Sequence, residues 1–189
     1  MKTVFLERAD LSDPAFRAWF MNSKVVDESG EPAVVYHGTV GDFDVFRQTR
    51  DVGFHFGTKA AAAARLKHHA TDVMTKDRPQ NVMPVYLSVQ KPLELGDLLT
   101  WEPDDISREL VSRDIFSQGE YERVAMRGSR DDRNRELVVL LKSKGYDGAS
   151  YKNAAEDIGS TTWVAFDPWQ VKSVFNRGTW DRRRASIME

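Results

Sequence analysis

Two short segments of the same form constrain this chain more than any other feature of its sequence. Tyr-His-Gly-Thr stands at residues 36–39 and His-Phe-Gly-Thr at residues 55–58. The first follows a short apolar run at residues 33–36, which is typical of a strand. We expect that strand to end at His37 and to deliver polar groups into a cleft. Gly38 would let a ligand meet bare backbone there.

The second segment is expected to lead from a strand into a helix. Gly53 opens an aromatic stretch, Gly57 closes it, and the alanine-rich run at residues 59–70 follows. Thr58 is a suitable N-cap for that run. A strand that feeds a helix N-terminus is a natural site for phosphate or carboxamide oxygens. A single histidine beside a strand is more often structural, so the pairing of the two segments is what indicates a site.

Composition narrows the class of protein. The chain has 189 residues, of which 41% are hydrophobic, so we expect one domain with its core at about residues 14–176 and a tail at 177–189. Its 27 basic and 29 acidic residues give a net charge of -2, which provides no chain-wide field for gripping nucleic acid. The absence of cysteine excludes disulfides and thiolate chemistry. Lacking a long apolar run or a signal peptide, the sequence predicts a cytoplasmic protein without membrane partners.

The first helix is expected directly before the paired segments. Asp13 is a suitable N-cap and Pro14 suits the first helical position. Phe16, Trp19 and Phe20 then fall on one face of the helix. This aromatic stripe indicates core packing more than a ligand site.

The remaining pattern predicts short strands and few helices. A hairpin is expected from strands at residues 24–27 and 33–36 with a turn at residues 29–32. Further strands are expected at residues 83–89, 146–151, 161–166 and 171–175, and further helices at residues 103–116 and 135–144. A turn is expected at residues 91–93, a mobile loop at residues 118–133 and a frayed end at residues 181–189. Short strands without a βαβ rhythm favour an α+β fold built on antiparallel sheets.

The ordered motifs resemble a known family. The chain is similar to the ADP-ribosyltransferases of the diphtheria-toxin and poly(ADP-ribose) polymerase branch, and most of all to the ADP-ribosyltransferase domains of phage and mobile-element polyvalent proteins. The resemblance covers roughly residues 16–176 and rests on residues 36–39, 43–46, 53–58, 146–148 and 164–173. It implies a split core of two antiparallel sheets with flanking helices. It also implies a toxin or effector encoded by a phage and acting in the cytoplasm of a bacterial host.

The resemblance further implies that NAD is the co-substrate and that no metal is needed. His37 would hydrogen-bond the ribose on the adenosine side, the backbone of Gly38 would clamp the carboxamide, and Thr39 would support the ribose. A neutral imidazole, with one donor and one acceptor, suits a ribose diol. His55 stands where the family often has a tyrosine that stacks on nicotinamide, and a protonated ring there would repel the cationic nicotinamide. The residues expected to bind NAD are Tyr36, His37, Gly38, Thr39, Phe46, Phe54, His55, Phe56 and Gln170.

The catalytic carboxylate is displaced from its usual position. Many relatives have a glutamate at the start of the last site strand, where this chain has Thr162. The nearest carboxylates, Glu156 and Asp157, lie in the preceding loop, where the polyvalent-protein relatives also tend to have a glutamate. Breaking the bond between ribose and nicotinamide develops positive charge, as in glycoside hydrolysis. Glu156 is therefore the expected catalytic group, with His55 and Thr162 beside it.

The leading hypothesis is an NAD-dependent mono-ADP-ribosyltransferase that modifies a host macromolecule and releases nicotinamide. Thr162 at the glutamate position leaves open a non-catalytic module of the same fold that binds a partner protein. His55 leaves open an NAD-dependent RNA 2′-phosphotransferase, although only Arg47 and Arg50 lie near the first segment to grip a phosphate. The sequence does not indicate whether the acceptor is a protein or a nucleic acid.

Overall fold

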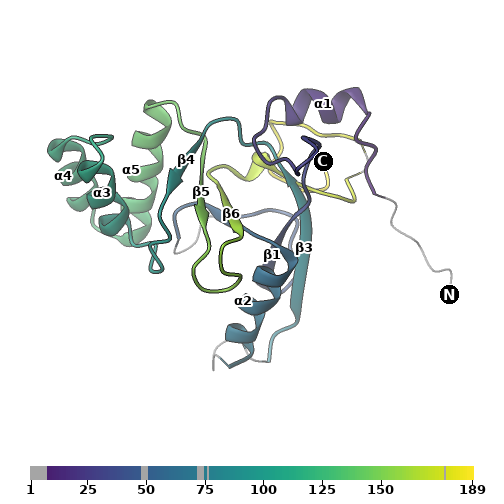
Figure 1. Ribbon diagram of the computed structural model, residues 1–189, viewed down its shortest axis with the longest axis horizontal. Helices are drawn as coiled ribbons and strands as arrows, with labels where there is room; N and C mark the ends of the chain where they lie inside the picture. The colour runs from purple at the N-terminus through teal and green to yellow at the C-terminus, as the bar shows by residue number, and fades with distance from the viewer. Residues whose placement is uncertain (1–7, 48–50, 72–74, 76, 177) are drawn as a thin grey trace.

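The structure, a computed structural model, describes residues 8–47, 51–71, 75, 77–176 and 178–189. Two sheets form its centre (Figure 1). The first is antiparallel and has the order β1-β3-β7, from β1 (Val35–Val40), β3 (Gln80–Leu87) and β7 (Val171–Ser173). The second has the order β2-β6-β5-β4, from β2 (Phe54–Phe56), β6 (Thr161–Ala165), β5 (Gly148–Lys152) and β4 (Pro92–Leu95). The predicted α+β class is confirmed.

The second sheet is mixed, whereas two antiparallel sheets were expected. β4 runs parallel to β5, because three helices separate them and return the chain to the same end of the sheet. These helices are α3 (Pro103–Ser112), α4 (Gln118–Ala125) and α5 (Arg130–Ser143). Figure 1 shows them gathered at one end of the molecule beside β4. The other helices are α1 (Pro14–Phe20), α2 (Lys59–Thr71) and the short 3-10 turn η1 (Pro168–Gln170).

Three apolar clusters hold these layers together. One lies between α3–α5 and the mixed sheet and includes Leu110, Leu137 and Val164. A second includes side chains of both sheets. The third confirms the predicted core role of the α1 aromatic stripe, because Phe16 is fully buried and its ring lies 4.8 Å from that of Trp180. Burying such side chains contributes about 1.5–3 kcal/mol each.

The predicted hairpin formed only in part. Its turn is present, with the main-chain N–H of Gly30 donating to the oxygen of Asp27. Residues 24–27, however, form no strand beyond an isolated bridge between Val26 and Pro32. β1 pairs instead with β3, which begins at Gln80 and runs past the whole of β1. The expected turn at residues 91–93 was also wrong, because β4 begins at Pro92 and pairs with β5.

The predicted loop at residues 118–133 was wrong, because α4 and the start of α5 occupy it. Ser117 and Glu120 form a capping box, in which the Ser117 side chain accepts from the main-chain N–H of Glu120 and the Glu120 side chain accepts from that of Ser117. Ser129 caps α5 by accepting from the N–H of Asp132 at 3.1 Å. Both caps satisfy helix donors that would otherwise lack partners.

The predicted frayed end was also wrong. Ile187 is only 5% exposed, its N–H donates to the oxygen of Asp44 at 2.7 Å, and its oxygen accepts from Ser173 at 2.8 Å. The buried Lys172 donates through Nζ to the main-chain oxygens of Arg184 and Ser186. Buried main-chain groups need such partners, and the C-terminal segment is therefore part of the packed fold.

Candidate functional site

The two Gly-Thr segments lie side by side. Tyr36 and Gly57 form a bridge in which each N–H donates to the other's oxygen, at 2.9 and 3.0 Å. Nδ1 of His37 lies 2.8 Å from the main-chain oxygen of His55. A carbonyl oxygen can only accept a hydrogen bond, so Nδ1 of His37 carries the proton. The neutral ring then has its lone pair on Nε2.

His37 does not stand at a strand end as expected. β1 continues through Thr39 to Val40, because β3 provides partners over that whole length. Gly38 is required for a packing reason, since a Cβ there would lie 2.4 Å from the main-chain oxygen of Ala62 on α2. The first turns of α2 therefore pass directly over the first segment.

The aromatic residues predicted for the site surround the His37 ring. Its centroid lies 5.1 Å from that of Phe46, 5.5 Å from that of Phe56 and 6.5 Å from that of Phe43. Phe54 extends the cluster, 5.3 Å from Phe46. Phe46, Phe54 and Phe56 are all buried, so the His37 imidazole packs against a fixed aromatic cluster on its core side.

Gln170 lies in a structural position. It is fully buried, and its Nε2 donates to the main-chain oxygens of Ser88 and Asp147. Its Oε1 accepts from the N–H groups of Phe166 and Asp167. All four hydrogen-bonding positions of the amide are used, so we assign Gln170 to holding strand ends together and not to contacting NAD.

His55 faces the other side of the mixed sheet, toward Trp101 and Tyr151. Its Nδ1 lies 3.2 Å from the Tyr151 hydroxyl, and its ring centroid lies 4.8 Å from that of Trp101. Its Nε2 is enclosed and has no hydrogen-bond partner among the described residues. Burial lowers the pKa of His55 to about 4. The ring is therefore neutral near pH 7 and would not repel a cationic nicotinamide.

Trp101 has an unusual backbone for a bulky residue, with φ at +49°. Its ring is buried and lies 4.7 Å from that of Tyr151. Burial also raises the pKa of the Tyr151 hydroxyl. Left-handed backbone at a non-glycine residue costs about 1–3 kcal/mol, and such strain often occurs at functional sites.

Glu156 and Thr162 come together, as the sequence suggested. Glu156 lies in the loop between β5 and β6, and Thr162 lies on β6 opposite Tyr151 of β5. Nδ2 of Asn153 donates to Oε2 of Glu156 at 2.9 Å and to Oγ1 of Thr162 at 3.2 Å. Nη1 of Arg65, on α2, lies 3.9 Å from Oε1 of Glu156. The Glu156 side chain is 22% exposed, so it can meet a ligand.

The same loop is joined to the N-terminus of α2. Thr58 is the predicted cap, since its Oγ1 accepts from the N–H of Ala61 at 3.1 Å. The Thr58 hydroxyl also donates to Asp157 at 2.5 Å. Both Gly-Thr segments and the Glu156 loop therefore meet around the start of α2.

Comparison with known proteins identifies the family. The model of the family described as ADP-ribosyltransferase in polyvalent proteins matches residues 27–180, which is most of the chain and includes both segments and the Glu156 loop. The chain belongs to this ADP-ribosyltransferase family. Membership supports ADP-ribosyltransferase activity in general terms and the use of NAD as a substrate.

Other comparisons add little to this ADP-ribosyltransferase assignment. No curated protein was found to match the chain. A crystal structure of an anti-CRISPR protein is similar at 12% sequence identity, with 70% of this chain and 88% of that chain covered and a TM-score of 0.31. A likeness at that score carries no argument about function.

Three residues of the candidate site were not predicted from the sequence: Arg65, Trp101 and Asn153. Arg65 and Trp101 reach the site from distant segments, and no local pattern indicates such contacts. Asn153 had a signal, because asparagine at a strand end often accepts hydrogen bonds from the next few main-chain N–H groups. Its burial, with 3% of the residue exposed, could not be predicted from the sequence.

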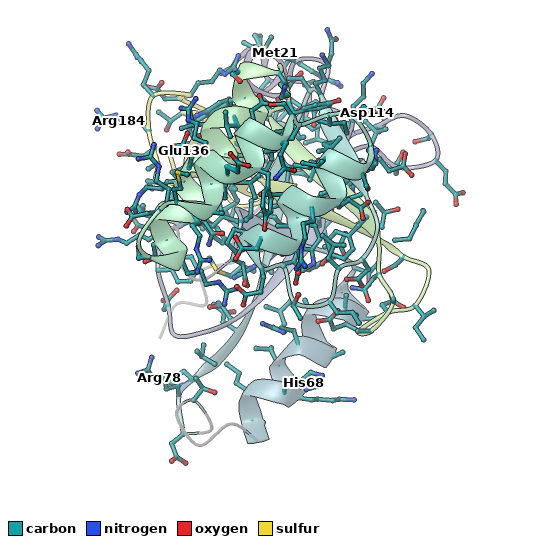
Figure 2. The ribbon with its side chains drawn as sticks, turned by 90° about the vertical axis from the view of Figure 1, so that its left-hand side faces the viewer. Met21, His68, Arg78, Asp114, Glu136 and Arg184 are labelled. Atoms are coloured by element: carbon teal, nitrogen blue, oxygen red, sulfur yellow. The ribbon has the colours of Figure 1, made fainter. Side chains whose placement is uncertain are left out.

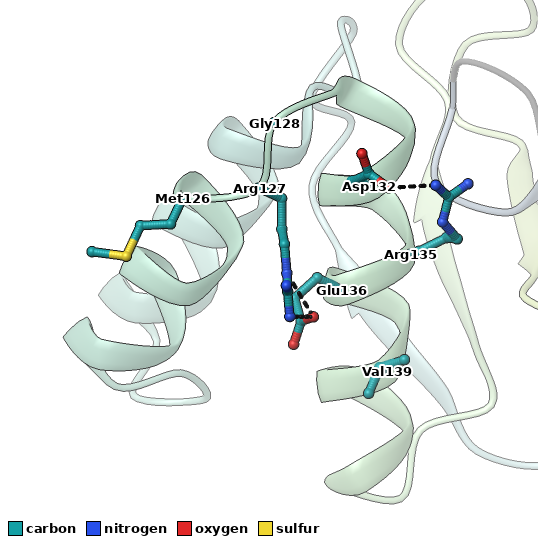
Figure 3. A pocket seen from close by; sticks show the side chains of 7 residues that line it. All are labelled: Met126, Arg127, Gly128, Asp132, Arg135, Glu136 and Val139. Carbon is teal, nitrogen blue, oxygen red and sulfur yellow. Dashed lines mark hydrogen bonds and ion pairs between the residues drawn. The ribbon is translucent and has the colours of Figure 1, made fainter.

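A surface hollow with a volume of about 400 Å³ lies elsewhere, between α5 and the connection that leads into it from α4 (Figure 3). Two of the residues that line it, Arg127 and Glu136, pair with one another, with Nε of Arg127 3.0 Å from Oε2 of Glu136. Figure 2 looks onto α3–α5 and shows Glu136 among these three helices. In the same view, α2, which carries His68, projects away from them. We assign this hollow no role in ADP-ribosyl transfer.

The residues that the structure describes contain no group of three or more His, Asp or Glu that could hold a metal ion. No helix in the described ranges is long and apolar enough to cross a membrane.

Proposed function

We propose that this domain is an NAD-dependent mono-ADP-ribosyltransferase that transfers ADP-ribose from NAD to a host macromolecule and releases nicotinamide. The observation that carries the proposal is the position of Glu156. Its carboxylate shares the Asn153 amide with Thr162, the residue that stands where many relatives have their strand glutamate. The loop thus provides the carboxylate that the strand lacks.

The chemistry needs positive charge to be stabilised as the bond between ribose and nicotinamide breaks. In the proposal, Glu156 faces the ribose of that bond, and its attraction grows as the charge develops. Neutral His55 stands near the leaving nicotinamide and adds no opposing charge. His37 accepts a ribose hydroxyl at Nε2, while its Nδ1–H stays bonded to the main chain of His55.

The two alternatives are weaker on this geometry. The binding-module hypothesis rests on the missing strand glutamate, and it has less support because Glu156 and Thr162 share the Asn153 amide. For RNA 2′-phosphate transfer, Arg47 is exposed on the segment after Phe46, and Arg50 lies outside the described residues. Among the residues that the structure describes, no contact directs Arg47 toward His37, so that hypothesis has less support than the one built on Glu156.

Isotope-labelled NAD, incubated with the purified domain and a bacterial lysate, tests the proposal. We expect label on one or more macromolecules, identified by mass spectrometry as added ADP-ribose, and we expect it to persist with a chelator present. Absence of both label and nicotinamide release would sink the proposal. Removal of a 2′-phosphate from an RNA oligomer in the presence of NAD would favour the phosphotransferase instead.

A further inference from the structure

We propose that Asn153 is the positioning residue that places the Glu156 carboxylate for reaction. The loop carboxylate then takes the role that a strand glutamate has in many relatives. This inference rests on the proposed function. Asn153 stands directly after the last residue of β5 and is nearly fully buried. Its side-chain oxygen and nitrogen both bond to groups of the protein. We therefore do not assign Asn153 a direct contact with NAD.

The acceptor side of Asn153 shapes the loop. Its Oδ1 accepts from the main-chain N–H groups of Ala155, Glu156 and Asp157, at 2.9, 2.8 and 3.2 Å. Its own main chain closes the loop, because its N–H donates to Ser160 and its oxygen accepts from Gly159. One residue therefore fixes the path of the chain on both sides of Glu156.

The donor side of Asn153 fixes the carboxylate itself. The two Nδ2 protons are divided between Oε2 of Glu156 and Oγ1 of Thr162. A hydrogen bond to a charged acceptor is stronger than one between neutral groups. An amide can accept from the loop and donate to the carboxylate at the same time, whereas an ionised aspartate, which has nearly the same shape, can only accept.

Charged and titratable groups from several elements surround Glu156. Arg65 approaches from α2, Tyr151 lies on β5, and Asp157 is its neighbour in the loop. Asp97, from the segment after β4, accepts from the N–H of Ala154 at 2.8 Å. His55 on β2 bonds the same Tyr151 hydroxyl. The Asn153 amide and Arg65 both approach the carboxylate of Glu156, whereas the Asp157 carboxylate accepts from the Thr58 hydroxyl.

Asn153→Asp tests the inference because it separates the two roles. The carboxylate still accepts from the three loop N–H groups, but it loses the donor and places a like charge beside Glu156. We expect the NAD dissociation constant to change little and kcat for nicotinamide release at pH 7 to fall roughly 10- to 100-fold. The melting temperature should fall, because a second carboxylate is buried beside Glu156, with the domain still folded at the assay temperature. The acidic limb of kcat against pH should move to higher pH, so that activity partly recovers in alkaline buffer.

A double variant provides the matched control. In Asn153→Asp with Glu156→Gln, the introduced glutamine amide can donate to the introduced aspartate carboxylate, which reverses the direction of the original hydrogen bond. We therefore expect the double variant to be as stable as the unmodified domain but inactive. An unshifted pH profile in Asn153→Asp, or a fall in kcat that only follows loss of folded protein, would overturn the inference while leaving the proposed function intact. If the unmodified domain releases no nicotinamide, the proposed function fails and this inference with it.

Discussion

Nδ1 of His37 donates a hydrogen bond to the main-chain oxygen of His55, with 2.8 Å between the two atoms. This contact joins the two similar segments directly. It also fixes the tautomer of one imidazole through the backbone of the other. A displacement of β2 would therefore change the orientation of the His37 ring.

His37→Asn is expected to lower NAD affinity while leaving the domain folded, because a polar contact is lost without opening a large cavity. We expect the dissociation constant for NAD, measured by calorimetry, to rise about 10-fold, which corresponds to about 1.4 kcal/mol. A variant that fails to fold would make His37 a structural residue, and one that folds and binds NAD normally would exclude His37 from the NAD site.

Glu156→Gln is expected to lower kcat for nicotinamide release by about 10²–10³, with a much smaller change in NAD affinity. Glutamine keeps the size and one acceptor oxygen but removes the charge, and that charge acts mainly in the transition state. Glu28→Gln, at an exposed turn, is the matched control. Asp157 is unsuitable, because it is bonded to the α2 cap. A silent Glu156→Gln together with an inactive Thr162→Val would transfer the role to the strand hydroxyl.

His55 should make the free energy of unfolding depend on pH. Burial lowers its pKa from 6.5 to about 4, so between these values the unfolded chain binds more protons than the folded one. The contribution of His55 to the free energy of unfolding is fully present above about pH 6.5 and is lost as the pH falls toward 4. We expect this loss to amount to about 1–3 kcal/mol.

Urea denaturation at pH 7 and pH 4.5 measures this effect. His55→Gln should lose less stability on acidification than the unmodified domain, whereas His68→Gln, at an exposed position on α2, should lose as much. Equal acid sensitivity in all three proteins would show that His55 is not held neutral by burial.

The C-terminal segment should contribute to stability beyond the range that matches the family. Ile187→Ala removes a side chain that is packed in the cluster that includes Phe46, and such a deletion typically costs about 2–4 kcal/mol. Met188→Ala, at a position that is 38% exposed, should cost less than about 1 kcal/mol. If denaturant unfolding shows similarly small losses in the free energy of unfolding for both variants, the C-terminal segment is frayed, as the sequence predicted.

Local patterns in the sequence predicted local structure well. Thr58 as a helix cap and the aromatic face of α1 were both confirmed, because each depends only on residues that are neighbours in the sequence. The missed α4 had a readable signal in Ser117 and Glu120, which are spaced as a capping box.

Features that depend on distant partners could not be predicted. The parallel pairing of β4 with β5 and the docking of Ile187 on Asp44 each join segments that no periodicity relates. The same holds for Trp101, which reaches His55 from a segment beyond β4. Glu156 was predicted from its loop, but the Asn153 side chain that holds it was not.

Nicotinamide release from NAD by the purified domain, compared between the unmodified protein and Glu156→Gln, tests the central claim most directly. The account predicts steady release by the unmodified domain and a rate about 10²–10³ lower for the variant at saturating NAD. Saturable NAD binding without release by either protein would contradict it and would make the domain a binding module.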